Sequence, residues 1–84
     1  MRKEEVLERL SEINENAIVL DDFKDALIGY TQNSFFSAVA VYDVEKCISM
    51  LIEQGMTPEN AVEYFDYNVL GAYFGEHSPI FVSL

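Results

Sequence analysis

The residues of this chain that could carry out nucleophilic chemistry are few and lie far apart. Cys47 and His77 are the only cysteine and the only histidine among the 84 residues. A cysteine nucleophile needs a base such as histidine within hydrogen-bond reach. Cys47 falls on the apolar stripe of a predicted helix, where a thiol is an inert part of the core. His77 lies in a Gly-Glu-His-Ser-Pro turn that we expect to face water. The sequence therefore predicts no nucleophilic catalysis.

Metal ligands are equally scarce. One cysteine and one histidine are too few for a structural zinc site. From Asp66 onward the chain matches a calcium-binding loop at positions one, three and six, which are Asp66, Asn68 and Gly71. Leu70 and His77 stand where that loop requires a further ligand and its closing carboxylate. We therefore expect no metal and no cofactor.

Carboxylates are abundant, with 15 Asp and Glu against 5 Lys and Arg and a net charge of −10. Acid–base catalysis needs two carboxyls in different environments, one of them desolvated, whereas these acids fall on polar faces, so we expect no enzyme. Direct nucleic-acid binding needs Lys and Arg opposite phosphates. Residues 47–84 contain neither, so we expect no direct binding to nucleic acid. Anionic membranes are disfavoured for the same reason. A partner with a basic surface would be steered toward the chain.

Acids and tyrosines occur together in the last third of the sequence. If Phe65 points inward, Tyr64 and Tyr67 flank it and are partly exposed, and tyrosine is an effective interface anchor. The alternative is that these rings finish covering a small core. The candidate protein-binding residues are Glu59, Glu63, Tyr64, Asp66, Tyr67, Asn68, Tyr73 and Glu76, with Asp21, Asp22 and Asp25 as additional charge.

Three helices are expected to position these residues, at about 3–15, 44–54 and from 58 to 71 or 75. Asp43 can cap the second helix, and Thr57, followed by proline, can cap the third. Their apolar stripes are Val6, Leu7, Leu10, Ile13 and Ala17; Val44, Cys47, Ile48, Leu51 and Ile52; and Ala61, Val62, Phe65, Val69 and Ala72.

A β-hairpin is predicted over about 26–42, with a polar turn at 32–34 and its clearest strand at 36–42. Residues 21–31 can be read as a short helix or as a strand, and the hairpin favours the strand. A C-terminal strand at about 79–83 is expected to join the hairpin. The length suits a single domain over residues 1–84. The predicted fold class is α+β, with three helices packed on a small antiparallel sheet.

Four segments together resemble a family of small uncharacterised phage and prophage proteins. They are Leu20–Gly29, Ala40–Ile48, Glu63–Ala72 and Gly75–Phe81, which read LDDFKDALIG, AVYDVEKCI, EYFDYNVLGA and GEHSPIF. The resemblance covers about residues 17–82. It implies a phage or mobile-element setting, and with it a small protein that acts by binding a host protein. It implies no activity, ligand or catalytic residue.

Cytoplasmic localisation, in the host cytosol, is the expectation that follows. No window approaches the roughly 20 apolar residues that cross a bilayer. The first five residues start with positive charge but have no apolar run behind them, so we expect no signal peptide. A single cysteine is typical of a reducing compartment.

The sequence leaves two functional hypotheses. In the first, a non-catalytic acidic protein binds a host or phage protein, and its sharper form is a nucleic-acid mimic that inhibits a host enzyme. In the second, the chain is a self-associating structural or accessory protein. A homo-oligomer would then form through the open edge of the sheet or through Phe35 and Phe36.

Overall fold

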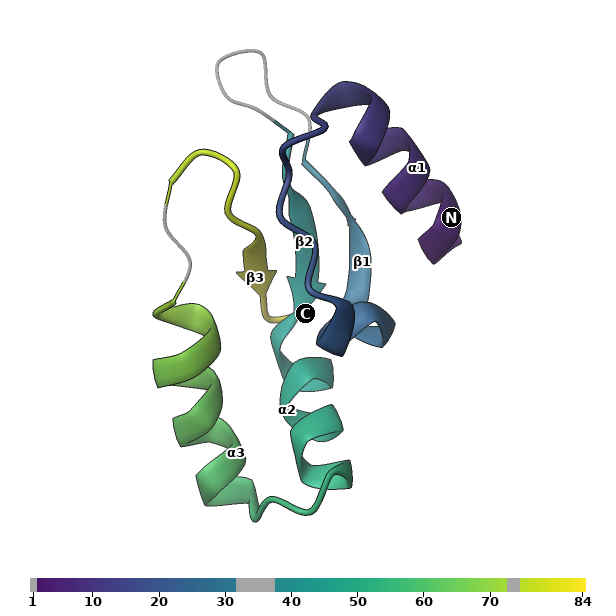
Figure 1. Cartoon of the computed structure of the whole chain (residues 1–84). Helices are drawn as coiled ribbons and strands as arrows, with labels where there is room; N and C mark the ends of the chain where they lie inside the picture. Colours follow the sequence, from purple (N-terminus) through teal and green to yellow (C-terminus); the bar gives the residue numbers. More distant parts are fainter. Residues whose placement is uncertain (1, 32–37, 73–74) are drawn as a thin grey trace.

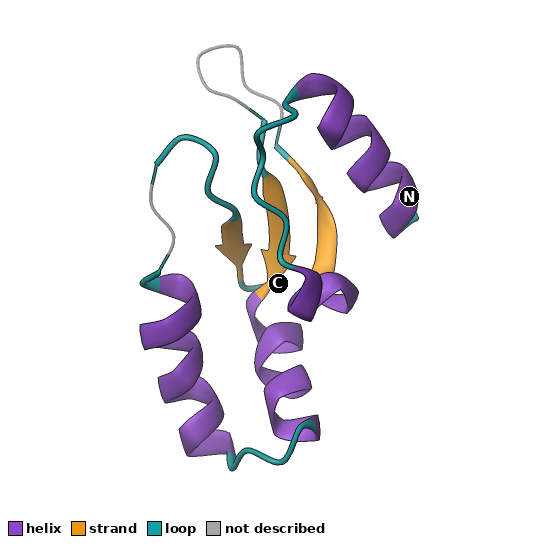
Figure 2. Ribbon diagram, in the orientation of Figure 1, coloured by secondary structure: helices purple, strands orange, loops and turns teal. Residues whose placement is uncertain are grey.

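The computed structural model describes residues 2–31, 38–72 and 75–84 and has an α+β fold (Figures 1 and 2). The elements in chain order are α1 (Lys3–Ile13), the 3₁₀-helix η1 (Asp21–Ala26), β1 (Leu27–Tyr30), β2 (Ala40–Asp43), α2 (Val44–Glu53), α3 (Pro58–Tyr64), the π-helical turn η2 (Phe65–Leu70) and β3 (Ile80–Val82). The predicted α+β class is confirmed. Both readings of residues 21–31 apply, because the segment begins as η1 and continues as β1.

The sheet has the order β1-β2-β3, with β2 in the centre (Figure 2). β1 and β2 pair antiparallel, as the hairpin prediction requires, with a register shift between Leu27 and Gly29. The predicted turn at 32–34 lies outside the described residues, as does the start of the predicted strand at 36–37.

The prediction of a purely antiparallel sheet is wrong, because β3 pairs with β2 in parallel. β2 runs directly into α2, and α3 leads the chain back before β3 enters the sheet (Figure 1). A connection of this length, built from helices, returns the chain to the same end of the sheet and produces a parallel pair. The sheet is therefore mixed.

The two predicted helix caps are present. The Asp43 carboxylate accepts hydrogen bonds from the backbone N–H groups of Glu45 and Lys46 at the start of α2. The Thr57 hydroxyl accepts the backbone N–H of Asn60 at 3.2 Å, and proline follows at the first helical position of α3. These caps satisfy donors that a helix cannot satisfy internally. They fix where the two helices begin.

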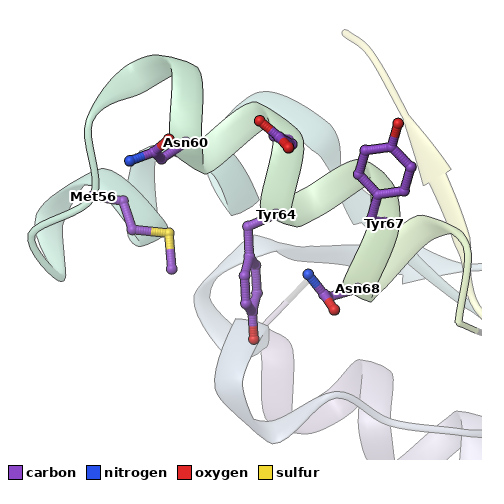
Figure 3. A pocket seen from close by; sticks show the side chains of 6 residues that line it. Met56, Asn60, Tyr64, Tyr67 and Asn68 are labelled. Atoms are coloured by element: carbon purple, nitrogen blue, oxygen red, sulfur yellow. The ribbon is translucent and has the colours of Figure 1, made fainter.

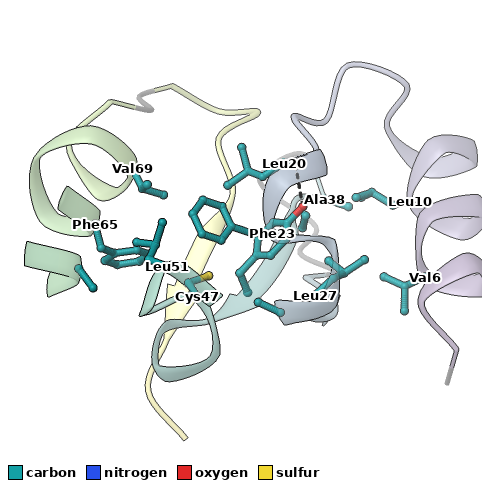
Figure 4. Packing of buried hydrophobic residues seen from close by; sticks show 14 residues of the cluster. Val6, Leu10, Leu20, Phe23, Leu27, Ala38, Cys47, Leu51, Phe65 and Val69 are labelled. Carbon is teal, nitrogen blue, oxygen red and sulfur yellow. Dashed lines mark hydrogen bonds between the residues drawn. The ribbon is translucent and has the colours of Figure 1, made fainter. Parts of the chain in front are cut away.

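Each helix buries only part of its predicted stripe (Figure 4). The buried helical residues are Val6 and Leu10 of α1, Cys47 and Leu51 of α2, Ala61 of α3, and Phe65 and Val69 of η2. Ile13, Ile52, Val62 and Ala72 are exposed instead. Residues four apart lie on nearly the same side of a helix. The neighbouring elements therefore cover one narrow row, and positions beside that row stay in water.

A buried hydrogen bond ties the chain before η1 to the centre of the sheet. The backbone N–H of Leu20 donates to the Tyr42 hydroxyl at 2.8 Å (Figure 4). Tyr42 is completely buried, and its ring stacks on that of Phe81 in β3. The bond holds the start of η1 against β2 and so fixes where the next residues, Asp21 and Asp22, can lie.

His77 takes part in a second attachment instead of simply facing water. The side-chain amide nitrogen of Asn14 lies 2.9 Å from the Ala38 carbonyl oxygen and 3.1 Å from His77 Nδ1. The His77 carbonyl accepts the backbone N–H of Ile18 at 3.1 Å. The His77 side chain is 32% exposed. These bonds join the end of α1, the chain before β2 and the chain before β3.

Candidate functional site

An open groove of about 490 Å³ lies along α3 and η2 (Figure 3). Its lining residues are Met56, Asn60, Glu63, Tyr64, Tyr67 and Asn68. Four of these belong to the predicted protein-binding set, namely Glu63, Tyr64, Tyr67 and Asn68. The structure thus brings half of that set together on one surface, which we call the tyrosine groove.

The switch from α3 to the π-helical turn η2 keeps two rows of side chains aligned. The buried row is Ala61, Phe65 and Val69, and the groove row is Asn60, Tyr64 and Asn68. In an α-helix, the directions of two side chains four residues apart differ by about 40° around the helix axis. The wider π-turn reduces this difference, and its i to i+5 bonding is seen where the Gly71 N–H donates to the Asp66 carbonyl at 3.1 Å. Tyr64 and Asn68 therefore face the same side.

The two tyrosines differ in how they sit on this surface. Tyr67 is 76% exposed and points away from the chain, whereas Tyr64 is 42% exposed and lies between Met56 and Asn68 (Figure 3). Phe65 makes a T-shaped ring contact with Phe81 of β3, on the buried side of this segment. Phe65 points inward as expected. The rings of Tyr64 and Tyr67 are available at the surface instead of closing the core.

A second hollow of about 360 Å³ adjoins the tyrosine groove, and we call it the η1 hollow. Its lining residues are Val19, Leu20, Asp21, Asp22, Phe23, Tyr64, Asn68 and Val69. Tyr64 and Asn68 line both hollows, so these two residues form a ridge between them. Asp21 and Asp22, far from α3 in sequence, therefore lie beside the predicted site.

Asp25 belongs to a different surface, although it lies in the same 3₁₀-helix as Asp21 and Asp22. Its carboxylate is 3.6 Å from Lys3 Nζ, and it lines a separate hollow together with Arg2 and Lys24. Three of the five basic residues of the chain thus gather at one corner. No Lys or Arg lines the tyrosine groove or the η1 hollow within the described part of the chain.

The remaining predicted residues are not gathered into the groove. Glu59 and Asp66 are exposed on α3 and η2 but line neither hollow. Glu76 lies in the turn before β3, with its carboxylate 3.5 Å from His77 Nε2. Tyr73 lies outside the described residues.

Sequence reasoning left Met56 and Asn60 out of the binding set. Asn60 precedes Tyr64 by one helical step of four residues, so helical spacing alone could have identified it. Met56 is partly buried against the core while also lining the groove. The approach of residues 19–23 to α3 had no signal in the local sequence.

The reactive groups of the chain are placed away from this surface. Cys47 is fully buried, and burial, with a smaller effect of the Asp43 carboxylate, raises the pKa of its thiol from 9.0 to about 11. A thiol with such a pKa is a poor nucleophile at neutral pH. Among residues 2–31, 38–72 and 75–84, no three His, Cys, Asp or Glu side chains are grouped as metal ligands.

Comparisons with known proteins give no relative: no family model, no curated protein and no solved structure matches the chain. In the part of the chain that the structure describes, no helix has both the length and the apolar character to cross a bilayer.

Proposed function

We propose that this chain is a non-catalytic acidic protein that acts by binding another protein through the tyrosine groove. The observation that carries the proposal is the joining of two accessible tyrosines, Tyr64 and Tyr67, with the Glu63 carboxylate along one 490 Å³ groove. Tyrosine rings contribute a large contact area at low conformational cost. The resemblance to phage and prophage proteins supports a host or phage protein as the partner.

The charge of the molecule supports a partner with a basic surface. The net charge is −10, and residues 47–84, which include the whole of α3 and η2, contain no Lys or Arg. Such a surface attracts basic proteins at long range and speeds their association. The sharper form of the proposal is a nucleic-acid mimic, in which carboxylates occupy the phosphate positions of a nucleic-acid-processing enzyme of the host.

Affinity capture followed by titration of the identified partner tests this proposal. The tagged chain is used as bait in a lysate of the cell that produces it, at low and at high ionic strength, and the captured protein is purified and titrated. We expect Tyr67→Ala to weaken binding by about 2 kcal/mol, which is about thirtyfold. Leu70→Ala is the matched control, because Leu70 is 49% exposed on the same turn but does not line the groove.

Two results would count against the proposal. Equal losses in the Tyr67 and Leu70 variants would mean that the groove is not the contact surface. Capture that does not depend on ionic strength would contradict a basic partner, since attraction between exposed charges is screened by salt.

Self-association is the second candidate function, and the outer edge of β3 favours it. β3 is an edge strand of the described sheet, and its first residue, Ile80, is 43% exposed. Such an edge can pair with another chain, and a lysine on it prevents pairing. A dimer measured by light scattering that dissociates in Ile80→Lys would support this function, and a monomer at high concentration would refute it. Phe35 and Phe36 lie outside the described residues.

A further inference from the structure

The tyrosine groove and the η1 hollow form one surface, because Tyr64 and Asn68 line both. The Tyr64 ring stands between Met56 on one side and Asn68 on the other (Figure 3). A ligand that fills only one hollow would leave the other face of this ridge in water. The continuous surface therefore suits an elongated ligand that passes across Tyr64.

Acids lie on both sides of the Tyr64 ridge. Glu63 lines the tyrosine groove, and Asp21 and Asp22 line the η1 hollow. Within the described residues none of these three carboxylates forms an ion pair, and the cluster of Arg2, Lys3 and Lys24 lines another hollow. The complementary ligand carries a cation on each side of the ridge.

The ridge favours arginine over lysine as the cation. A planar guanidinium stacks on an aromatic face and pairs with a carboxylate through two parallel hydrogen bonds. Tyr64 supplies the ring, and Asp21 and Asp22 lie in the hollow on one side of it. The apolar part of an arginine side chain can also lie along the Met56 side chain.

The length of the groove and its amides favour an extended segment. From Asn60 to Asn68 the chain rises at most about 12 Å, since α3 rises about 1.5 Å per residue and the wider π-turn rises less. About four residues of extended chain cover this distance. The side-chain amides of Asn60 and Asn68 form no hydrogen bond among the described residues. They can therefore donate to and accept from the backbone of a peptide.

We infer that the element recognised on the partner is an extended, arginine-bearing segment that crosses Tyr64 and places guanidinium groups beside Glu63 on one side and Asp21 and Asp22 on the other. This inference rests on the proposed function, because it names the part of the partner that enters the tyrosine groove.

Fluorescence anisotropy with a labelled peptide, in which three arginines alternate with serines, tests the inference on the full chain. We expect Tyr64→Ala, and separately Asp21→Asn with Asp22→Asn, to raise the dissociation constant about fivefold or more. The control is Glu12→Gln with Glu53→Gln, which has the same net charge as the double aspartate variant but changes no residue of either hollow. We expect the control to change the constant less than about twofold.

Tyr64→Phe keeps the ring and is expected to bind like the wild type, which separates ring stacking from loss of fold. Equal weakening by the control and by the double aspartate variant would overturn the inference, because net charge alone would then explain binding. Absence of binding to the arginine peptide would overturn it as well. The proposed function would survive either result if capture of the natural partner still depended on Tyr67.

Discussion

Tyr42→Phe tests whether the buried bond between Tyr42 and Leu20 holds the η1 hollow in place. The substitution removes one hydroxyl oxygen and keeps the ring, whose contact with Phe81 belongs to the core. The Leu20 N–H, which donates to this hydroxyl at 2.8 Å, would then lack this acceptor. Tyr42 is 0% exposed and Leu20 is 6% exposed, so water does not readily replace the hydroxyl.

The expected cost follows from burial. Leaving a buried donor without its acceptor costs about 1–3 kcal/mol. In a domain of this size, each 1 kcal/mol lowers the melting temperature by roughly 4–8 °C. We therefore expect Tyr42→Phe to melt about 5–20 °C below the wild type. The backbone before η1 would also open more often.

Two measurements check this prediction. Thermal unfolding followed by circular dichroism gives the global cost, and amide hydrogen exchange at Leu20 gives the local one, which should be faster in the variant. Tyr67→Phe is the matched control, because Tyr67 is 76% exposed. The reasoning would be refuted if Tyr42→Phe melted with the wild type and Leu20 kept its protection, or if both variants lost the same stability.

Four further predictions concern the remaining polar contacts and the thiol. Asn14→Ala removes the bonds to the Ala38 carbonyl and to His77, and urea unfolding should show a loss of about 1–2 kcal/mol. Thr57→Ala should cost about 0.5–2 kcal/mol through loss of the cap, while Thr57→Ser should restore most of it in the same assay. Native Cys47 should resist a thiol reagent at pH 8 and react once urea unfolds the chain; rapid native reaction would contradict its burial. Burial raises the pKa of Cys47 from 9.0 to about 11 in the folded state, so the unfolded chain loses the thiol proton at a lower pH than the folded chain does. The free energy of unfolding, and with it the midpoint of urea unfolding, therefore falls as the pH rises from 9 toward 11. A Cys47→Ala variant should lack this fall in the urea midpoint.

The starts of two helices could be predicted because their signals are local. Asp43 and Thr57 each cap a helix with an oxygen that reaches backbone donors two or three residues away. The apolar stripes indicated the buried rows correctly at Cys47 and Phe65. They wrongly placed Ile52 in the core. An apolar stripe does not show how much of the helix surface the neighbouring elements cover, and in the structure they leave Ile52 exposed.

The sequence by itself determined where α1, α2 and α3 begin, the antiparallel pairing of β1 with β2, the acidic character of the chain and the presence of tyrosines after Pro58. It left residues 21–31 open between helix and strand. Only the tertiary structure decided that β3 pairs in parallel with β2 and that Asp21 and Asp22 lie beside Tyr64 across a shared hollow. The physical reason is the range of the interactions. Caps and stripes act within a few residues, whereas the bond between Leu20 and Tyr42 joins positions 22 residues apart and forms only when the core has assembled.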